Sequence, residues 1–181
     1  MRVSLLEFSS ADQPLLQSWV SEGGIPRYMS RYAPRSYKDG TWSKMHALWW
    51  VIVADERPVG TVWVERDTNG ARRGELGIFI GLSGSRGIGI GSKAVLLAEQ
   101  FAADIWNVET VNLRVRATNE RARRCYAKIG YHDTRTFQKV LQSGERIDVI
   151  EMEHRLKMPN QSTDPTLASV TPDAGHQARH P

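Results

Sequence analysis

The hydrophobic and polar positions of this chain follow two periods in turn, one typical of strands and one typical of helices. Runs of β-branched and aromatic residues predict strands at 3–8, 49–54, 59–66, 75–80, 110–117, 134–141 and 146–156. Apolar residues at helical spacing predict helices that begin at Asp12, Ile90 and Asn119. Short turns join the second, third and fourth strands into an antiparallel meander. The pattern therefore predicts an α/β fold with a mixed sheet flanked by helices.

The ends and faces of the three helices can be read from particular residues. Asp12 is the expected N-cap of the first helix, with Pro14 in its first turn. The third helix is expected to run from Asn119 to Ile129 and to end at Gly130. The second is expected to end near Asp104, with a buried face made by Ile90, Ala94, Leu97, Ala98 and Phe101.

The length and the composition bound the organisation of the chain. Its 181 residues, with 40% hydrophobic and 24% charged residues, correspond to one globular domain that can build its own core. Four of the eight prolines fall in residues 158–181, which show no hydrophobic period. We expect a domain at 1–157 followed by a mobile tail at 158–181.

The chain has none of the usual signals for export, membrane insertion or a structural metal. Its one cysteine, Cys125, cannot form an internal disulfide, and no cysteine or histidine spacing indicates a metal site. Residues 1–20 do not resemble a signal peptide, and no window is apolar enough for a membrane span. We therefore expect a cytoplasmic protein without a metal and without a membrane partner.

A glycine-rich loop, Arg86-Gly87-Ile88-Gly89-Ile90-Gly91, lies between a predicted strand and a predicted helix. Glycines there allow a tight turn that directs several backbone N–H groups, together with the positive end of the helix, toward one anion. The order Gly91-Ser92-Lys93 does not fit a Walker A loop, and the GxGxG spacing does not fit the dinucleotide fingerprint. The loop could also be only a flexible connection, so a second motif is needed to decide.

That second motif is Asn119-Glu-Arg-Ala122-Arg-Arg-Cys-Tyr126-Ala-Lys128-Ile-Gly130-Tyr131. Together the two motifs resemble those of the GNAT N-acetyltransferase superfamily. The loop fits its (Gln/Arg)xxGxG signature, and the later helix fits its NxxAxxxYxKxG(F/Y) signature at every defined position. The resemblance covers about residues 3–156. It is greatest to the branch that contains ribosomal-protein N-terminal acetylases, polyamine acetyltransferases and aminoglycoside acetyltransferases.

The resemblance implies a mostly antiparallel GNAT-like sheet whose two central strands splay apart to hold acetyl-CoA. The pantetheine arm would pair with the strand edge at 78–80, and a backbone N–H near Ile78 or Phe79 would donate to the thioester oxygen. Asn119 would cap its helix and also contact the pantetheine arm. The expected cofactor-binding residues are Ile78, Phe79, Ile80, Arg86, Gly87, Ile88, Gly89, Ile90, Gly91, Ser92, Asn119 and Arg124.

Two residues are candidates for the proton transfers of acetylation. Glu75 is placed where related enzymes often keep a carboxylate that deprotonates the amine, directly or through water. The alternative is a solvated carboxylate facing Arg72 or Arg73. Tyr126 is placed to protonate the departing thiolate, the alternative being a packed aromatic residue. Cys125 is better interpreted as a small buried residue than as a nucleophile.

The resemblance implies that the first helix and residues 25–50, which are rich in aromatic side chains, cover the acceptor side, with the closing hairpin opposite. Tyr28, Trp49 and Glu75 are the residues expected to bind the acceptor, although at least half of the aromatic residues there should be structural. The preferred acceptor is a small polycationic amine such as an aminoglycoside antibiotic. The alternative acceptors are a protein N-terminus and a polyamine. The alternative to an enzyme is a basic non-catalytic module that binds CoA or nucleic acid. No nucleic-acid partner is expected, and a homodimer is left open.

The charge of the chain is concentrated in one segment. The net charge is +4, with a pI near 9.4, but residues 112–128 alone hold six basic residues and one acidic residue. The remaining residues up to 157 are balanced. We interpret this segment as a patch for the phosphates of CoA, which leaves the acceptor side without a positive surplus.

Overall fold

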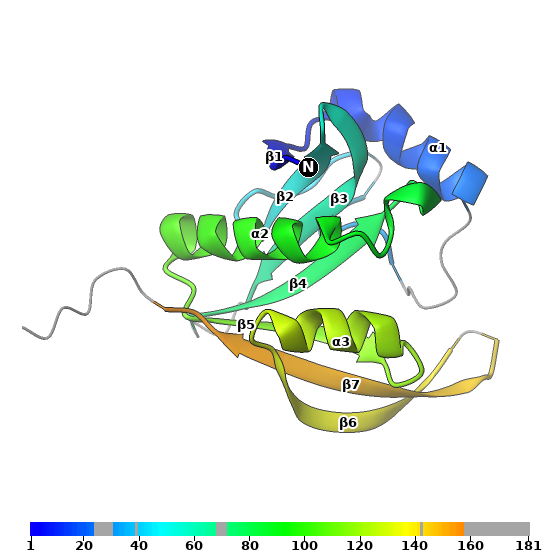
Figure 1. Ribbon diagram of the computed structural model, residues 1–181, viewed down its shortest axis with the longest axis vertical. Helices are drawn as coiled ribbons and strands as arrows, with labels where there is room; N and C mark the ends of the chain where they lie inside the picture. Colours follow the sequence, from blue (N-terminus) through cyan, green and yellow to red (C-terminus); the bar gives the residue numbers. More distant parts are fainter. Residues whose placement is uncertain (24–30, 39, 68–71, 142, 158–181) are drawn as a thin grey trace, which may run out of the picture.

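A seven-stranded sheet forms the centre of the protein in a computed structural model, which describes residues 1–23, 31–38, 40–67, 72–141 and 143–157 (Figure 1). The helices are α1 (Gln13–Gly23), α2 (Ile90–Trp106) and α3 (Glu120–Lys128). The strands are β1 (Val3–Glu7), β2 (Ala47–Ala54), β3 (Arg57–Arg66), β4 (Arg73–Ile80), β5 (Thr110–Arg116), β6 (His132–Val140) and β7 (Arg146–Arg155).

The strands follow the order β1-β2-β3-β4-β5-β7-β6, and every neighbouring pair except one is antiparallel. The exception is the pair β4 and β5, which is parallel because α2 carries the chain across the sheet between these strands. The two strands pair only from Arg73 with Thr110 to Glu75 with Asn112. Beyond that point they separate, as the family resemblance implies for the two central strands.

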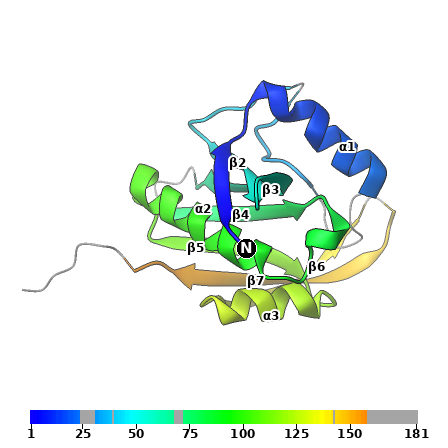
Figure 2. The same ribbon diagram turned by 45° about the horizontal axis from the view of Figure 1, so that its top comes forward.

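Helices cover both faces of this sheet, and each face has its own core. The core beneath α2 and α3 includes Ile52, Val62 and Val111, all fully buried. On the other face α1 contributes Leu16 and Trp19 to a smaller aromatic core. Figure 2 shows α1 and α3 on opposite sides of the strands. Because both faces are covered, β2 and β3 are buried along most of their length.

The predicted elements are all present, but two helical details were wrong. Asp12 does not cap α1: its carboxylate accepts hydrogen bonds from the backbone and hydroxyl of Ser9, which caps a short 3-10 turn preceding α1. Helix α2 continues to Trp106, and its buried face is rotated from the predicted one toward Val95, Glu99 and Ala102. The predicted core residue Phe101 is 37% exposed and stacks on Trp50.

Some expectations concern residues that the structure does not describe. The tail at 158–181, the residue Tyr28 and most of the turn after Asp67 lie outside the described residues. Within the described part of the chain, no helix combines the length and the apolar composition that crossing a membrane requires.

Candidate active site

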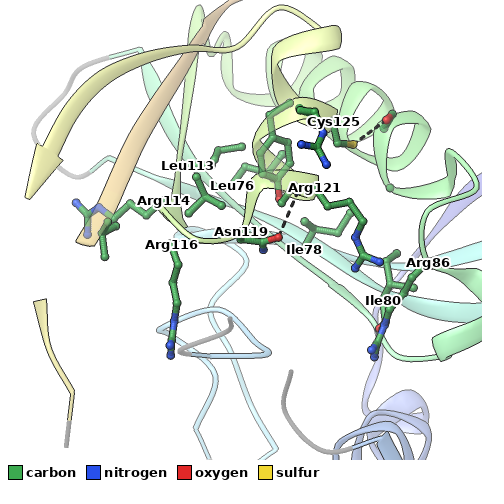
Figure 3. Close-up of a pocket in the computed structure, with 18 of the residues that line it drawn as sticks. Leu76, Ile78, Ile80, Arg86, Leu113, Arg114, Arg116, Asn119, Arg121 and Cys125 are labelled. Atoms are coloured by element: carbon green, nitrogen blue, oxygen red, sulfur yellow. Dashed lines mark hydrogen bonds between the residues drawn. The ribbon is translucent and has the colours of Figure 1, made fainter. Parts of the chain in front are cut away.

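A cavity of about 950 Å³ opens where β4 and β5 separate; we call it the central cavity (Figure 3). Its walls come from the facing strands, the glycine-rich loop, α3, and the β6–β7 hairpin, together with Arg31 and Arg35 from the segment that follows α1. Residues 76–80 of β4 have no strand partner on the β5 side, because the pairing ends at Glu75. This leaves a strand edge inside the cavity, where an extended ligand can complete the ladder.

The glycine-rich loop gives the central cavity an anion-binding wall. Gly87 and Gly89 have φ of +83° and +89°, and Gly89 is the N-cap of α2 without a side-chain capping bond. A side chain at Gly91 would meet only Ile78, at 3.8 Å, so this glycine leaves open space at the first turn of the helix. The N-terminus of α2 therefore offers backbone N–H groups to an anion in the cavity.

Cations surround this part of the cavity, the glycine-loop end, which we define by Arg86, Gly91, Arg121 and Arg124. Arg86 is held by hydrogen bonds to the carbonyls of Ile80, at 3.0 Å, and Gly81, at 3.3 Å. Arg124 pairs with Glu120 at 3.1 Å, whereas Arg121 has no ion pair among the described residues. In Figure 3, Arg86 and Arg121 lie on the opposite side of the cavity from Arg114 and Arg116.

Helix α3 brings Asn119, Cys125 and Tyr126 to the central cavity. Asn119 caps the helix as predicted, accepting a hydrogen bond from the Ala122 N–H at 3.3 Å. Cys125 is half-buried and lies 2.9 Å from the Ser92 hydroxyl. Burial, with a smaller contribution from Cys125, raises the pKa of Tyr126, so its hydroxyl keeps its proton at neutral pH.

Two glutamates and two arginines form an interlocked cluster at the other end of the cavity, which we call the carboxylate clamp: Arg31, Arg35, Glu65 and Glu75. Glu65 on β3 lies directly opposite Glu75 on β4. Like charges in such register repel, but each arginine contacts both carboxylates. Glu75 accepts from Arg31 at 2.8 Å and from Arg35 at 2.7 Å, and the backbone N–H of Arg35 donates to Glu65 at 2.6 Å. The clamp thus holds Arg31 and Arg35 against the sheet.

The clamp determines the acid strength of Glu75. Burial by itself would raise the pKa of this carboxyl, but the hydrogen bond from Arg35 and the charges of Arg35, Arg114 and Arg31 outweigh it and lower the pKa. Its partners are not Arg72 and Arg73, which pair with Glu109 and Glu153 instead. A carboxylate stabilised in this way is a weaker base than an ordinary glutamate.

Further cations from β5 and β6 line the cavity beside the clamp, and we call this region the arginine end. Arg114 lies 3.2 Å from Glu151 and 3.8 Å from Glu75. Arg116 and Phe137 both lie opposite Val149 in the strand register, so these three side chains share one face of the sheet. The cations that line this end are Arg31, Arg35, Arg114, Arg116 and Lys139.

Most of the residues predicted from the sequence line the central cavity, and a few do not. Glu75, Tyr126, Ile78, Ile80, Arg86, Gly87, Gly89, Gly91, Ser92, Asn119 and Arg124 line it. Ile88, Phe79 and Ile90 do not: Ile88 is 57% exposed, and the side chains of the other two are in the cores. Trp49 was wrongly predicted as an acceptor residue, since it is 2% exposed and stacks on Phe8 at 3.6 Å.

Several residues of the site were missed by the sequence analysis. Trp63, 1% exposed, lines the cavity, with the guanidinium of Arg31 5.6 Å from its ring. Its ring fills the space that a side chain at Gly77 would need. The clamp partners Arg31 and Arg35 and the cation Arg116 carried no motif. The role of Arg31 and Arg35 follows from their ion pairs with Glu65 and Glu75, and that of Arg116 follows from the strand register.

Comparison of the sequence with known proteins identifies its family. The family model described as "Acetyltransferase (GNAT) family" matches residues 14–131. An uncharacterised N-acetyltransferase of Methanocaldococcus jannaschii is 30% identical over 139 residues, which cover 77% of this chain and 84% of that protein.

Solved structures of acetyltransferases share the fold. A GNAT acetyltransferase from Streptococcus pneumoniae has a TM-score of 0.69 at 18% identity, covering 86% of this chain and all of that one. Aminoglycoside acetyltransferase AAC(6')-Ib, in complex with coenzyme A and kanamycin, has a TM-score of 0.67 at 17% identity, with 85% and 95% covered. A dodecameric spermidine N-acetyltransferase from Vibrio cholerae has a TM-score of 0.66 at 17% identity, with 84% and 93% covered.

Proposed function

Because the chain belongs to the acetyltransferase (GNAT) family, we propose that it transfers the acetyl group of acetyl-CoA directly to the primary amine of a small molecule. It is an acyltransferase, and acetyl-CoA is its co-substrate. The observation that carries the proposal is one continuous cavity that joins the glycine-loop end, the free edge of β4 and the arginine end. Donor and acceptor can therefore meet without a covalent intermediate on the protein.

The described residues fit acetyl-CoA, which supplies an activated acetyl group as a thioester. The N-terminus of α2 and the cations Arg86, Arg121 and Arg124 would hold the phosphates. The unpaired edge of β4 would hold the amides of the pantetheine arm. Gly91 supports this fit independently, because its missing side chain leaves space at the helix terminus that the fold itself does not use.

Tyr126 is the proposed proton donor. In the net reaction the bond between the acetyl carbon and sulfur breaks, and a bond from that carbon to the amine nitrogen forms. One proton leaves the nitrogen, and one proton is gained by the sulfur. Tyr126 lines the cavity, and its hydroxyl stays protonated because burial raises its pKa, so we propose that it supplies that proton.

The amine must lose a proton to react, and the contacts of Glu75 make it a poor base for this step. We propose that Glu75 instead orients Arg31 and Arg35 in the cavity wall. Nearby guanidinium charges disfavour the ammonium form of a bound amine, which lowers its pKa and increases the reactive neutral fraction. The released proton can pass to solvent, with Glu75 as a weak relay.

The acceptor is the finer part of the proposal. The sequence led us to expect a polycationic amine such as an aminoglycoside, and the likeness of the fold to AAC(6')-Ib and to a spermidine N-acetyltransferase supports a small-molecule acceptor. N-terminal acetylation of a protein has no comparable support among these structures. The charges at the arginine end favour a small molecule that also carries an anionic group.

A panel of amines tests the proposed activity. The full-length protein is incubated with acetyl-CoA and with aminoglycosides, polyamines, amino acids, phosphorylated amines or short peptides, and released thiol and product mass are recorded. We expect at least one non-peptide primary amine to gain one acetyl group at a rate well above thiol release without acceptor. Binding of acetyl-CoA without acetylation of any amine would overturn the proposed activity, and a preference for peptides would overturn the small-molecule acceptor.

A further inference from the structure

The arginine end of the central cavity holds more positive charge than its carboxylates neutralise. Its cations are Arg31, Arg35, Arg114, Arg116 and Lys139. The carboxylates in ion pairs with them are Glu65, Glu75 and Glu151. Among the described residues, Arg116 and Lys139 make no ion pair, so two positive charges remain without a partner in the cavity wall.

The carboxylates at this end are not available to a cationic acceptor. Both clamp arginines contact Glu75, whose side chain is 17% exposed, and Glu65 is 7% exposed beneath them. A polycation would have to displace Arg31 and Arg35 from these partners while approaching three further cations. Each such contact between like charges is unfavourable, and more so in a partly enclosed cavity than in water.

The free cations are well placed for an oxyanion. Arg116 and Phe137 both lie opposite Val149, and Lys139 lies opposite the adjacent residue of the same sheet face, Ile147. A guanidinium and an ammonium on one face can bind a carboxylate or a phosphate with charge-assisted hydrogen bonds. Apolar side chains of Phe137, Ile147 and Val149 line the same part of the cavity and would contact the carbon atoms of a bound ligand.

These cations are separate from those available to the phosphates of CoA. Figure 3 shows Arg114 and Arg116 on one side of the cavity and Arg86 and Arg121 on the other. The glycine-loop end has its own cations and the N-terminus of α2. The surplus at the arginine end therefore remains for the second substrate.

We propose that the acceptor is an anionic amine: a small molecule that carries a carboxylate or a phosphate in addition to the amine that is acetylated. This inference rests on the proposed function. Arg116 and Lys139 bind the anionic group, and the clamp arginines complete the positive wall around it. The amine then lies in the cavity between this wall and the free edge of β4 at Gly77 and Ile78, where the acetyl donor is expected.

Matched amines that differ only in the anionic group test this inference. The pairs are ethanolamine with phosphoethanolamine, and tyramine with tyrosine, and spermidine and kanamycin serve as polycations. We expect kcat/KM to be about tenfold or more higher for at least one anionic member than for the partner that lacks the anionic group, and lower for both polycations. A higher kcat/KM for either polycation than for both anionic amines would overturn the inference but leave the proposed activity standing. Acetylation of no amine would overturn the activity itself.

Two variants separate the roles of the two ends. For Arg116→Gln we expect KM for the anionic acceptor to rise about tenfold, with KM for acetyl-CoA within about twofold of the wild type. For Arg124→Gln, a matched change at the glycine-loop end, the larger rise should be in KM for acetyl-CoA. Arg116→Lys, which keeps the charge, should recover part of the acceptor affinity. An Arg116→Gln variant with unchanged acceptor KM, or with a rise only in KM for acetyl-CoA, would contradict the assignment.

Discussion

Tyr126 is the residue that we propose as the proton donor to the departing sulfur. Among the described residues it is the only tyrosine that lines the central cavity, and burial raises the pKa of its hydroxyl. If this hydroxyl protonates the departing sulfur, Tyr126→Phe should lower kcat by about a hundredfold, while KM for acetyl-CoA changes little. Steady-state kinetics with the best acceptor measure both quantities.

The neighbouring residue Tyr131 offers a matched control. Its ring lies 5.7 Å from that of Tyr126, but it is 3% exposed and does not line the cavity. Tyr131→Phe removes the same hydroxyl group without touching the reacting atoms, so kcat should stay within about threefold of the wild type. Equal losses in both variants would show that the effect on kcat comes from packing and not from proton transfer.

Glu75 links the carboxylate clamp to the pH dependence of stability. Because the arginines lower its pKa in the folded protein, its charge stabilises the fold above the unfolded pKa of about 4.5. That contribution is lost as the pH falls through the lower folded value. We expect Glu75→Gln to reduce the free energy of unfolding by about 2 kcal/mol at pH 7. The difference from wild type should shrink steadily below about pH 4.5.

Urea unfolding at several pH values measures this difference. Glu7→Gln is a suitable control, since the Glu7 side chain is 63% exposed and, within the part of the chain that the structure describes, pairs only with Lys44. An exposed pair of this kind contributes little at any pH. A Glu75→Gln deficit of the same size at pH 3 and pH 7 would rule out the ion pairs as its cause.

The sequence located the candidate cofactor-binding and proton-donor residues of the cavity better than it located the carboxylate clamp. Gly89, Gly91, Asn119 and Tyr126 occupy fixed spacings within two continuous segments, so motif reasoning could find them. The clamp joins residues 30 to 44 positions apart, and it depends on Glu65 lying opposite Glu75 in the strand register. Charges brought together only by tertiary contacts leave no local pattern, so the sequence offers Glu75 as a base by family resemblance and does not reveal its arginine partners.

Two glycines at the N-terminus of α2 differ in why a side chain is absent. Gly89 has a backbone conformation that favours glycine, whereas Gly91 leaves space that we assign to acetyl-CoA. Gly89 has a positive φ, so Gly89→Ala should cost about 1–2 kcal/mol of stability. Gly91 lies in the helix with open space around it, so Gly91→Ala should unfold at the same urea concentration as the wild type, or a higher one. Its added methyl group should nevertheless raise KM for acetyl-CoA several-fold, because it occupies space in the cavity.

Unfolding curves and KM measured on the same two preparations decide between these roles. If Gly91→Ala lowers stability as much as Gly89→Ala and leaves KM unchanged, Gly91 serves the backbone and not the co-substrate. If Gly89→Ala is as stable as the wild type, the positive φ is not maintained in solution.

The order and type of the elements followed from the sequence because each is encoded locally. Alternating β-branched residues and short polar turns specify the meander, and the caps specify α3. What the sequence could not give was the exact orientation of α2. Its buried face includes Glu99, which accepts from His154 at 3.0 Å, because a tertiary partner on β7 allows a carboxylate to be buried there. Hydrophobic periodicity alone assigns such a residue to the solvent side.

In the molecule as a whole, positively charged side chains lie at both ends of the central cavity. The sequence placed the surplus of residues 112–128 on the cofactor helix and left the acceptor side neutral. The structure corrects this division, because β5 carries Arg114 and Arg116 to the arginine end, away from Arg121 and Arg124 on α3. The same net charge thus supplies cations to both ends of one cavity. A homodimer stays a prediction.

This internal placement of charge argues against nucleic acid as the partner. Nine lysines and arginines among the described residues line the central cavity, where Glu75 is the one carboxylate. A duplex binds through many phosphates along an extended surface, and it cannot follow cations into a cavity. We expect binding of a 20-base-pair duplex to be weak, about 10 μM or worse, at 150 mM salt and to fall steeply as salt is raised. Fluorescence anisotropy measures it, and nanomolar affinity at that salt would show that the cations form an open surface.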